Sequence, residues 1–202
     1  MDILIIFMKH IQANTFKEIL HNNYPVSDAT IQAVLDHCVV EDVKKGESII
    51  SKGKVCDYIV FVLNGIFRVS YENDGKEATL CFGTEGDPFM SLHSYHAGLP
   101  AQFSFEAITN ATIAKIKFSD FNRLIDQYVD LNRWFTSVLV EQVFAFEARY
   151  VNLSGQSAYD RYLTLRRIRK EIINQIPLKY IAQYLNITPE TLSRIRAEFA
   201  KK

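Results

Sequence analysis

The amino-acid sequence predicts an α+β protein built from an N-terminal β jelly-roll barrel, a long helix and a C-terminal helix-turn-helix without a clear wing. Three observations carry this prediction. Short runs rich in Ile, Val, Phe and Tyr alternate with glycine-containing turns between residues 46 and 117. A helical period then continues from about residue 130 to residue 153. Two short apolar-periodic runs flank Asn186-Ile187-Thr188 near the end of the 202 residues.

Charge is divided unevenly along a chain whose formal net charge is zero. Residues 157–202 contain 10 Lys and Arg against 4 Asp and Glu, whereas residues 1–156 contain 13 against 19. A basic end on an otherwise acidic chain is typical of a segment that meets a polyanion, although a solvated helix face has the same composition.

The cysteines and the first residues bear on where the protein works. Cys38, Cys56 and Cys81 are dispersed without a Cys-x-x-Cys pair, which favours a reducing compartment over a disulfide framework or an iron–sulfur site. The opening "MDILIIFMKH" has an apolar run far shorter than the roughly 20 residues of a membrane span, and it lacks the positive charge of a signal peptide. The sequence therefore predicts a cytoplasmic protein with no membrane partner and no metal.

The N-terminal part combines helices with many short strands. Residues 27–38 have helical spacing, with Ser27 or Asp28 as the cap, and a weaker helix is expected around residues 12–20. Six apolar runs follow, and Asn73-Asp74-Gly75 marks a hairpin turn. Short strands at this spacing are typical of a sandwich or a jelly-roll barrel, which we place in residues 1–130.

Helical spacing returns after the strands. Ser119 is positioned to cap a helix through Gln127, and Asp130 or Leu131 opens the long run to about Leu153. At 1.5 Å per residue this run is roughly 34 Å long, more than a small barrel needs. Its apolar stripe predicts a dimerisation helix over 131–155, unless the helix simply lies on its own barrel. The stripe consists of Leu131, Phe135, Val138, Leu139, Gln142, Phe146 and Arg149.

The last segment, residues 156–202, has the spacing of a helix-turn-helix. Pro177 suits the start of a short helix, which Asn186 ends in a left-handed conformation. Thr188 then caps a second helix, in which Pro189 is a favoured first residue. The inward positions of this second helix are Leu192, Ile195 and Phe199.

The outward face of the second helix carries side chains suited to base recognition. In a helix-turn-helix the second helix lies in the DNA major groove. There Arg194 can read guanine, Glu190 can accept from cytosine and Ser193 is adaptable, whereas lysines and other arginines suit phosphates. An ordinary helical hairpin packed on the barrel is the structural alternative. The predicted DNA contacts are Thr188, Pro189, Glu190, Thr191, Ser193, Arg194, Lys179 and Arg196.

This order of elements resembles the CRP/FNR family of bacterial transcription regulators, which join a cyclic-nucleotide-binding-like jelly roll to a helix-turn-helix. The resemblance runs from about Ile31 onward and is carried by "GESIISKG", "DYIVFVLNGIFRV", "DGKE" and "YIAQYLNITPETLSRI". Glu190, Thr191 and Arg194 stand where the family has E-T-x-x-R. The resemblance implies a homodimer, not an enzyme, that reads a pseudo-palindromic site with the 189–200 helix. It also implies that residues 1–130 sense an effector, and it makes RNA polymerase a further candidate partner.

The effector region departs from the cyclic-AMP-binding members of that family. Those members carry a Gly-Glu pair and, about ten residues on, an Arg that pairs with the cyclic phosphate. Here "PFMSLHSYHAGLPAQFSF" has neither, and no Arg stands between Arg68 and Arg123. A buried phosphate without a cation is unfavourable, so we expect weak or no cyclic-AMP binding and a different effector, or none. The expected pocket residues are Met90, Ser91, Leu92, His93, Gln102, Phe103 and Phe146.

Other interpretations stay open from the sequence. Many family members have a β-hairpin wing where only Lys201 and Lys202 follow Ala200 here, so weaker phosphate contact is expected. A small-molecule sensor with weak or vestigial DNA binding fits the stretch "SLHSYHAG". A cupin-like metalloenzyme would use His93, His96 and Glu106 as ligands, but the His-x-His spacing of that fold is missing. The sequence also lacks a defensible Ser-His-Asp, Cys-His or paired-carboxylate arrangement.

Overall fold

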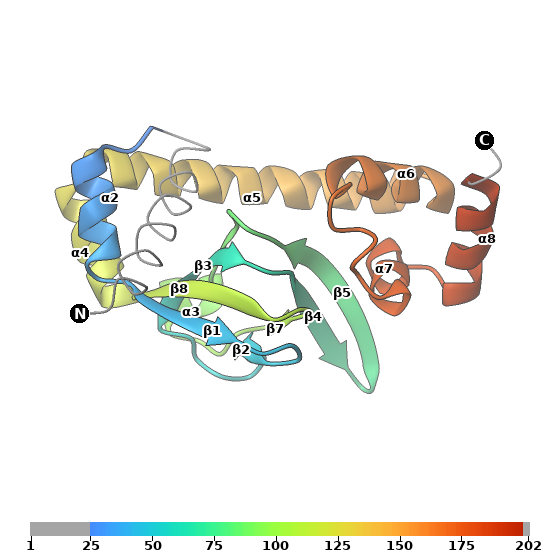
Figure 1. The fold of residues 1–202 in the computed structure, drawn as a ribbon, viewed down its shortest axis with the longest axis horizontal. Helices are drawn as coiled ribbons and strands as arrows, with labels where there is room; N and C mark the ends of the chain where they lie inside the picture. The colour runs from blue at the N-terminus through green and yellow to red at the C-terminus, as the bar shows by residue number, and fades with distance from the viewer. Residues whose placement is uncertain (1–24, 200–202) are drawn as a thin grey trace, which may run out of the picture.

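A computed structural model describes residues 25–199, and Figure 1 shows its strands gathered beneath one long helix. The helix expected around residues 12–20 and the final lysines lie outside the described residues. Within the described part, no helix is both long enough and apolar enough to cross a lipid bilayer.

The described residues form two four-stranded antiparallel sheets. Sheet A has the order β1 (Val39–Val43), β8 (Ala111–Lys117), β3 (Tyr58–Asn64) and β6 (Pro88–Phe89). Sheet B has the order β2 (Ser48–Ile50), β7 (Ser104–Ala107), β4 (Phe67–Asn73) and β5 (Lys76–Gly83).

The two sheets are not closed into a barrel, so the predicted closed barrel is wrong and the domain is a sandwich. The edge strands β2 and β6 are only three and two residues long, too short to carry a ladder from one sheet to the other. Apolar side chains fill the space between the sheets, and the rings of Phe67 and Phe105 stack there with centroids 4.5 Å apart. The predicted hairpin turn is present between β4 and β5, where Asp74 and Gly75 both have positive φ.

Helices α2 (Asp28–Leu35), α4 (Phe118–Gln127) and the first part of α5 (Val129–Gly155) cover the outer face of sheet A. Ser27 caps α2, accepting a hydrogen bond from the backbone N–H of Thr30. The predicted Ser119 cap of α4 is wrong. β8 runs directly into α4, and the Phe118 N–H is already bonded to the Asp57 carbonyl.

Helix α5 has 27 residues and is about 40 Å long. Part of the stripe that the sequence assigned to a dimer seam contacts this chain. Leu131, Phe135 and Val138 are buried against the sandwich, and Gln142, Phe146 and Arg149 line a cavity described below. One side of α5 covers the apolar outer face of sheet A, so the stripe residues on that side are buried within the chain.

The C-terminal segment contains α6 (Ala158–Ile168), α7 (Leu178–Leu185) and α8 (Pro189–Phe199). The turn between α7 and α8 is as predicted: Asn186 has φ +53°, and Thr188 Oγ1 accepts from the Thr191 N–H at 3.2 Å. Pro177 is the cap residue of α7 rather than its first helical residue. The apolar core of this segment also includes Ile66, Phe82 and Ile108 of the sandwich.

Candidate DNA interface and effector pocket

Helix α8 lies at the end of the molecule, beyond α7 and away from the strands (Figure 1). Leu192 and Ile195 are buried toward α7, whereas the opposite side faces outward. The predicted contacts on that side are exposed, except for the half-buried Thr191. The exposed residues are Thr188, Pro189, Glu190, Ser193, Arg194 and Arg196.

The first turn of α8 keeps Glu190 ionised. Hydrogen bonds from its own backbone N–H and from the Thr188 side chain lower the pKa of Glu190. An ionised carboxylate at the N-terminus of a helix is also favoured by the helix dipole. Glu190 is therefore presented to solvent as a hydrogen-bond acceptor.

Lys179, predicted to contact phosphate, is partly engaged by its own chain. Its Nζ lies 3.2 Å from Glu77 Oε2 on β5, although two-thirds of the side chain remains exposed. Helix α7 as a whole lies against β5.

A polar cluster on the outer face of sheet B holds α7 in this position. We call it the docking cluster, and it consists of Arg68, Glu77, Glu106, Tyr180 and Gln183. The buried guanidinium of Arg68 pairs with Glu77 and donates to Glu106 at 2.9 and 3.2 Å. It also lies 3.8 Å from the ring centre of Tyr180, and Nη1 donates to Gln183 Oε1 at 3.4 Å. Gln183 in turn donates to Glu77 at 3.1 Å, so strand and helix share one hydrogen-bond network.

The docking cluster changes the acidity of Glu77. Burial by itself would raise the pKa of this carboxyl group. Hydrogen bonds from Arg68 and Gln183, with the positive charges of Arg68 and Lys179, outweigh burial and bring the pKa to about 2. Glu77 therefore stays ionised at neutral pH. Sequence reasoning missed this cluster, although an Arg in the apolar run "IFRVSYE" was a usable signal.

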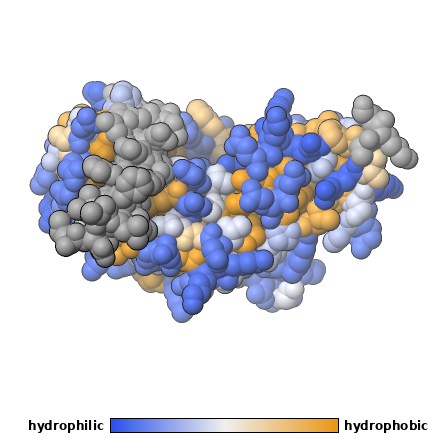
Figure 2. Space-filling model, viewed as in Figure 1, coloured by the Kyte–Doolittle hydropathy of each residue, from blue (hydrophilic) through white to orange (hydrophobic). Residues whose placement is uncertain are grey.

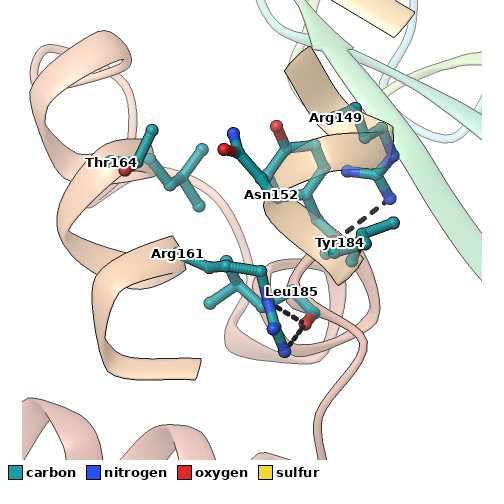
Figure 3. A pocket seen from close by; sticks show the side chains of 8 residues that line it. Arg149, Asn152, Arg161, Thr164, Tyr184 and Leu185 are labelled. Carbon is teal, nitrogen blue, oxygen red and sulfur yellow. Dashed lines mark hydrogen bonds between the residues drawn. The ribbon is translucent and has the colours of Figure 1, made fainter. Parts of the chain in front are cut away.

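Two arginines bind the C-terminal end of α7, as Figure 3 shows. Arg149 of α5 stacks on the Tyr184 ring at 4.4 Å, and its Nη2 donates to the Tyr184 carbonyl at 3.2 Å. Arg161 of α6 donates to the Leu185 carbonyl at 3.1 and 3.2 Å. These bonds satisfy carbonyls that have no partner inside the helix. Part of the basic excess of the C-terminal segment therefore holds the fold together and is not available for a polyanion.

A cavity of about 400 Å³ lies between the sandwich and α5. We call it the α5 cavity. The structure places all seven predicted pocket residues on its wall: Met90, Ser91, Leu92, His93, Gln102, Phe103 and Phe146. Sequence reasoning missed Arg149, which lies one helical turn beyond Phe146 and is the only Lys or Arg on the wall within the described residues.

The polar groups around the α5 cavity are mostly used within the chain. Ser91 is buried, and its hydroxyl caps the short helix α3 (Leu92–Ala97) by accepting from Ser94. Gln102 donates to the Pro100 carbonyl at 3.4 Å. The metalloenzyme alternative loses a ligand, because Glu106 is bound to Arg68 and lines a different cavity from His93 and His96. Among the described residues, no three His, Cys, Asp or Glu side chains are grouped as a metal site requires.

Comparison with known proteins agrees with this architecture. Residues 40–128 match the cyclic nucleotide-binding domain family. The chain is 22% identical over 182 residues to the cAMP-activated global transcriptional regulator CRP of Salmonella typhimurium, covering 85% of this chain and 87% of that protein. Together these matches support a regulator of the CRP/FNR type.

Solved structures of CRP/FNR proteins share the fold. FixK2 from Bradyrhizobium japonicum superposes with a TM-score of 0.69 at 19% identity, covering 81% of this chain and 85% of that one. The c-di-GMP responsive global regulator CLP of Xanthomonas campestris superposes with a TM-score of 0.71 at 13% identity, covering 87% and 92%. The different effectors named for CRP and CLP are properties of those proteins. At these identities the likeness to solved structures establishes the fold of this chain, and its effector and DNA site need separate arguments.

Proposed function

We propose that this protein is a DNA-binding transcription regulator that works in the cytoplasm as a homodimer and reads a pseudo-palindromic site with α8. In this proposal residues 1–130 sense an effector other than cyclic AMP, 131–155 dimerise and 156–202 bind DNA. The observation that carries the proposal is the outward side of α8, where Glu190, Ser193 and Arg194 are exposed while Leu192 and Ile195 are buried. CRP/FNR regulators bind DNA, and this helix has their E-T-x-x-R spacing.

The second half of α5 supports dimerisation by a second copy of the same helix. Apolar side chains there recur at intervals of three, four and seven residues and are exposed in the single chain. Figure 2 shows apolar surface around this part of the molecule. This spacing is that of helices that pair along a shared seam. The exposed residues are Val140, Val143, Phe144, Tyr150 and Val151.

The dimer is tested by placing a charge in this seam. Phe144→Glu should convert a dimer into a monomer in sedimentation velocity, because an unpaired carboxylate would be buried between the helices. Asn132→Glu is the matched control. Asn132 is exposed on the first part of the same helix, outside the proposed seam, so this change should leave the dimer intact. A wild-type protein that sediments as a monomer at micromolar concentration contradicts the proposed seam.

The DNA function is tested by selecting bound sequences from a random duplex pool at low salt. We expect a pseudo-palindrome with half-sites about 34 Å, one helical turn, apart. Arg194→Ala should then cost about 1–3 kcal/mol and relax the preference at one base pair of each half-site. Arg196→Ala should weaken binding evenly across sequences, because a phosphate contact carries no sequence information. Enrichment of no sequence, with no retention of any duplex, contradicts the proposal.

A second candidate function is a small-molecule sensor with weak or vestigial DNA binding. The observation that favours it is the use of Lys179 and Arg161 within the chain, by Glu77 and the Leu185 carbonyl. Arg169 is similarly used, donating to the Phe82 carbonyl and lying 3.5 Å from Asp87. Binding of a small molecule in the α5 cavity without measurable DNA affinity favours this candidate.

A further inference from the structure

The wall of the α5 cavity has two chemically different parts. Most of it is carbon, contributed by β4, β5 and the segment 88–103 on one side and by α5 on the other. The apolar side chains include Val69, Leu80, Phe89, Phe103, Val138 and Leu139. Along α5 the lining begins at Val138 and ends at Arg149, so this arginine lies at one end of an apolar wall about 16 Å long.

Arg149 carries a charge that no residue in the described part of the chain neutralises. Its two hydrogen bonds, to the carbonyls of Thr79 and Tyr184, both use Nη2. Neutral carbonyls accept these bonds without balancing the charge. Within residues 25–199 no carboxylate forms an ion pair with Arg149, and its Nε and Nη1 donate no hydrogen bond. A half-buried guanidinium with free donors in a planar fork is suited to an anionic ligand, a carboxylate above all.

We propose that the effector of this protein is an amphipathic organic acid whose apolar body fills the α5 cavity and whose carboxylate pairs with Arg149. The inference rests on the proposed function in taking the α5 cavity as the effector site. A volume of about 400 Å³ suits a small organic molecule. A nucleotide fits poorly, because its ribose and base edges need polar partners and most of the wall is carbon.

The same arginine connects the cavity with the helix-turn-helix. Its guanidinium lies on the ring of Tyr184 and binds the Tyr184 carbonyl at the end of α7 (Figure 3). A carboxylate that draws Arg149 into the cavity weakens this contact, and so binds more tightly to an arrangement in which α7 has moved. A ligand shifts an equilibrium only through such a difference in affinity. Arg149 is therefore the residue through which ligand occupancy changes the placement of α7 and α8.

The experiment is calorimetric titration of the full chain, without DNA, with 4-phenylbutyrate, the matched alcohol 4-phenylbutan-1-ol, and cyclic AMP. The acid should bind the wild type roughly 10- to 100-fold more tightly than the alcohol, because a hydrogen bond to a charged group contributes that much. Arg149→Gln should reduce this ratio to about one, as measured by the same titration. Arg123→Gln removes an exposed arginine that pairs with Asp120, and should behave as wild type.

Equal affinity of the wild type for acid and alcohol, or binding of neither, overturns the inference, and this comparison needs no variant to fold. Unchanged acid affinity in a folded Arg149→Gln protein also overturns it, as does binding of cyclic AMP more tightly than the acid. Because DNA is absent from the titration, the two proposals fail separately. A protein that binds the acid but retains no duplex supports this inference and contradicts the DNA function. A protein that retains duplex but does not bind the acid supports the DNA function and contradicts this inference.

Discussion

The outer faces of the two sheets are both covered by helices, but through different kinds of contact. On sheet A, α2, α4 and α5 bury a continuous apolar layer that includes Phe61, Phe121 and Trp134. On sheet B, α7 is held by the docking cluster around Arg68 and Glu77 together with a smaller apolar contact that includes Phe82. Separating an apolar layer exposes it to water and costs free energy, whereas ionised and hydrogen-bonded groups regain partners from water. The comparison predicts that α5 is held to the sandwich more firmly than α7, whose contact is the more polar of the two.

The largest effect is expected from opening the apolar side. Trp134 is fully buried and packs against Phe61 with ring centroids 6.0 Å apart. Trp134→Ala should lower the free energy of unfolding by about 3–5 kcal/mol, through lost burial and the cavity left behind. Urea denaturation followed by circular dichroism measures this. Thr136→Ala, on the exposed side of the same helix, should change stability by less than about 0.5 kcal/mol. Similar losses of stability in Trp134→Ala and Thr136→Ala contradict the attachment of α5 to sheet A through its buried apolar side.

A smaller and more local effect is expected from the polar side. Arg68→Met leaves Glu77 and Glu106 facing each other without the cation, at a cost of about 2–3 kcal/mol because both carboxylates keep some contact with water. Hydrogen exchange should rise mainly in α7 and α8, while the strands of sheet A keep their protection. Arg123→Met removes an exposed ion pair with Asp120, and should cost no more than about 1 kcal/mol. Uniform exchange across both sheets in Arg68→Met argues against a separable α7.

Acid should weaken the contact of α7 in a defined range of pH. The pKa of Glu77 falls from its ordinary 4.5 to about 2 in the folded protein. Its stabilising contribution is therefore complete above pH 4.5 and is lost as the pH falls toward 2. Between these values the wild type should lose more stability than Glu77→Gln, measured by urea denaturation at each pH. Glu72→Gln, exposed on the same hairpin, should follow the wild type. Parallel curves for all three proteins show that Glu77 makes no such contribution.

Local signals in the sequence predicted the features that depend on neighbouring residues. Asn186 and Thr188 were assigned to the turn between α7 and α8 because their cap and left-handed preferences are intrinsic. The direction in which α5 presents its stripe was not predictable in this way. Leu131 and Phe135 have the spacing of a dimer seam, and only the position of sheet A decides that they are buried within the chain.

The docking cluster and Arg149 were missed for a related reason. Arg68 and Gln183 are more than 100 residues apart, so no periodicity or motif connects them. The jelly-roll barrel was expected from the number and spacing of short strands, but closure depends on how the edge strands of the two sheets meet in space, and β2 and β6 have only three and two residues.

The smallest effect on stability is expected from replacing Lys179. This residue has two assigned roles, an ion pair with Glu77 and a phosphate contact. Its ion pair with Glu77 is largely exposed, so Lys179→Met should change the free energy of unfolding by less than about 1 kcal/mol. If Lys179 also contacts a phosphate once α7 detaches, the same change should reduce the slope of log affinity against log salt by about 1 per site. Duplex binding measured at several salt concentrations tests this, with Lys54→Met on the far turn of the sandwich as the control. An unchanged salt slope would show that Lys179 pairs with Glu77 and makes no phosphate contact when DNA binds.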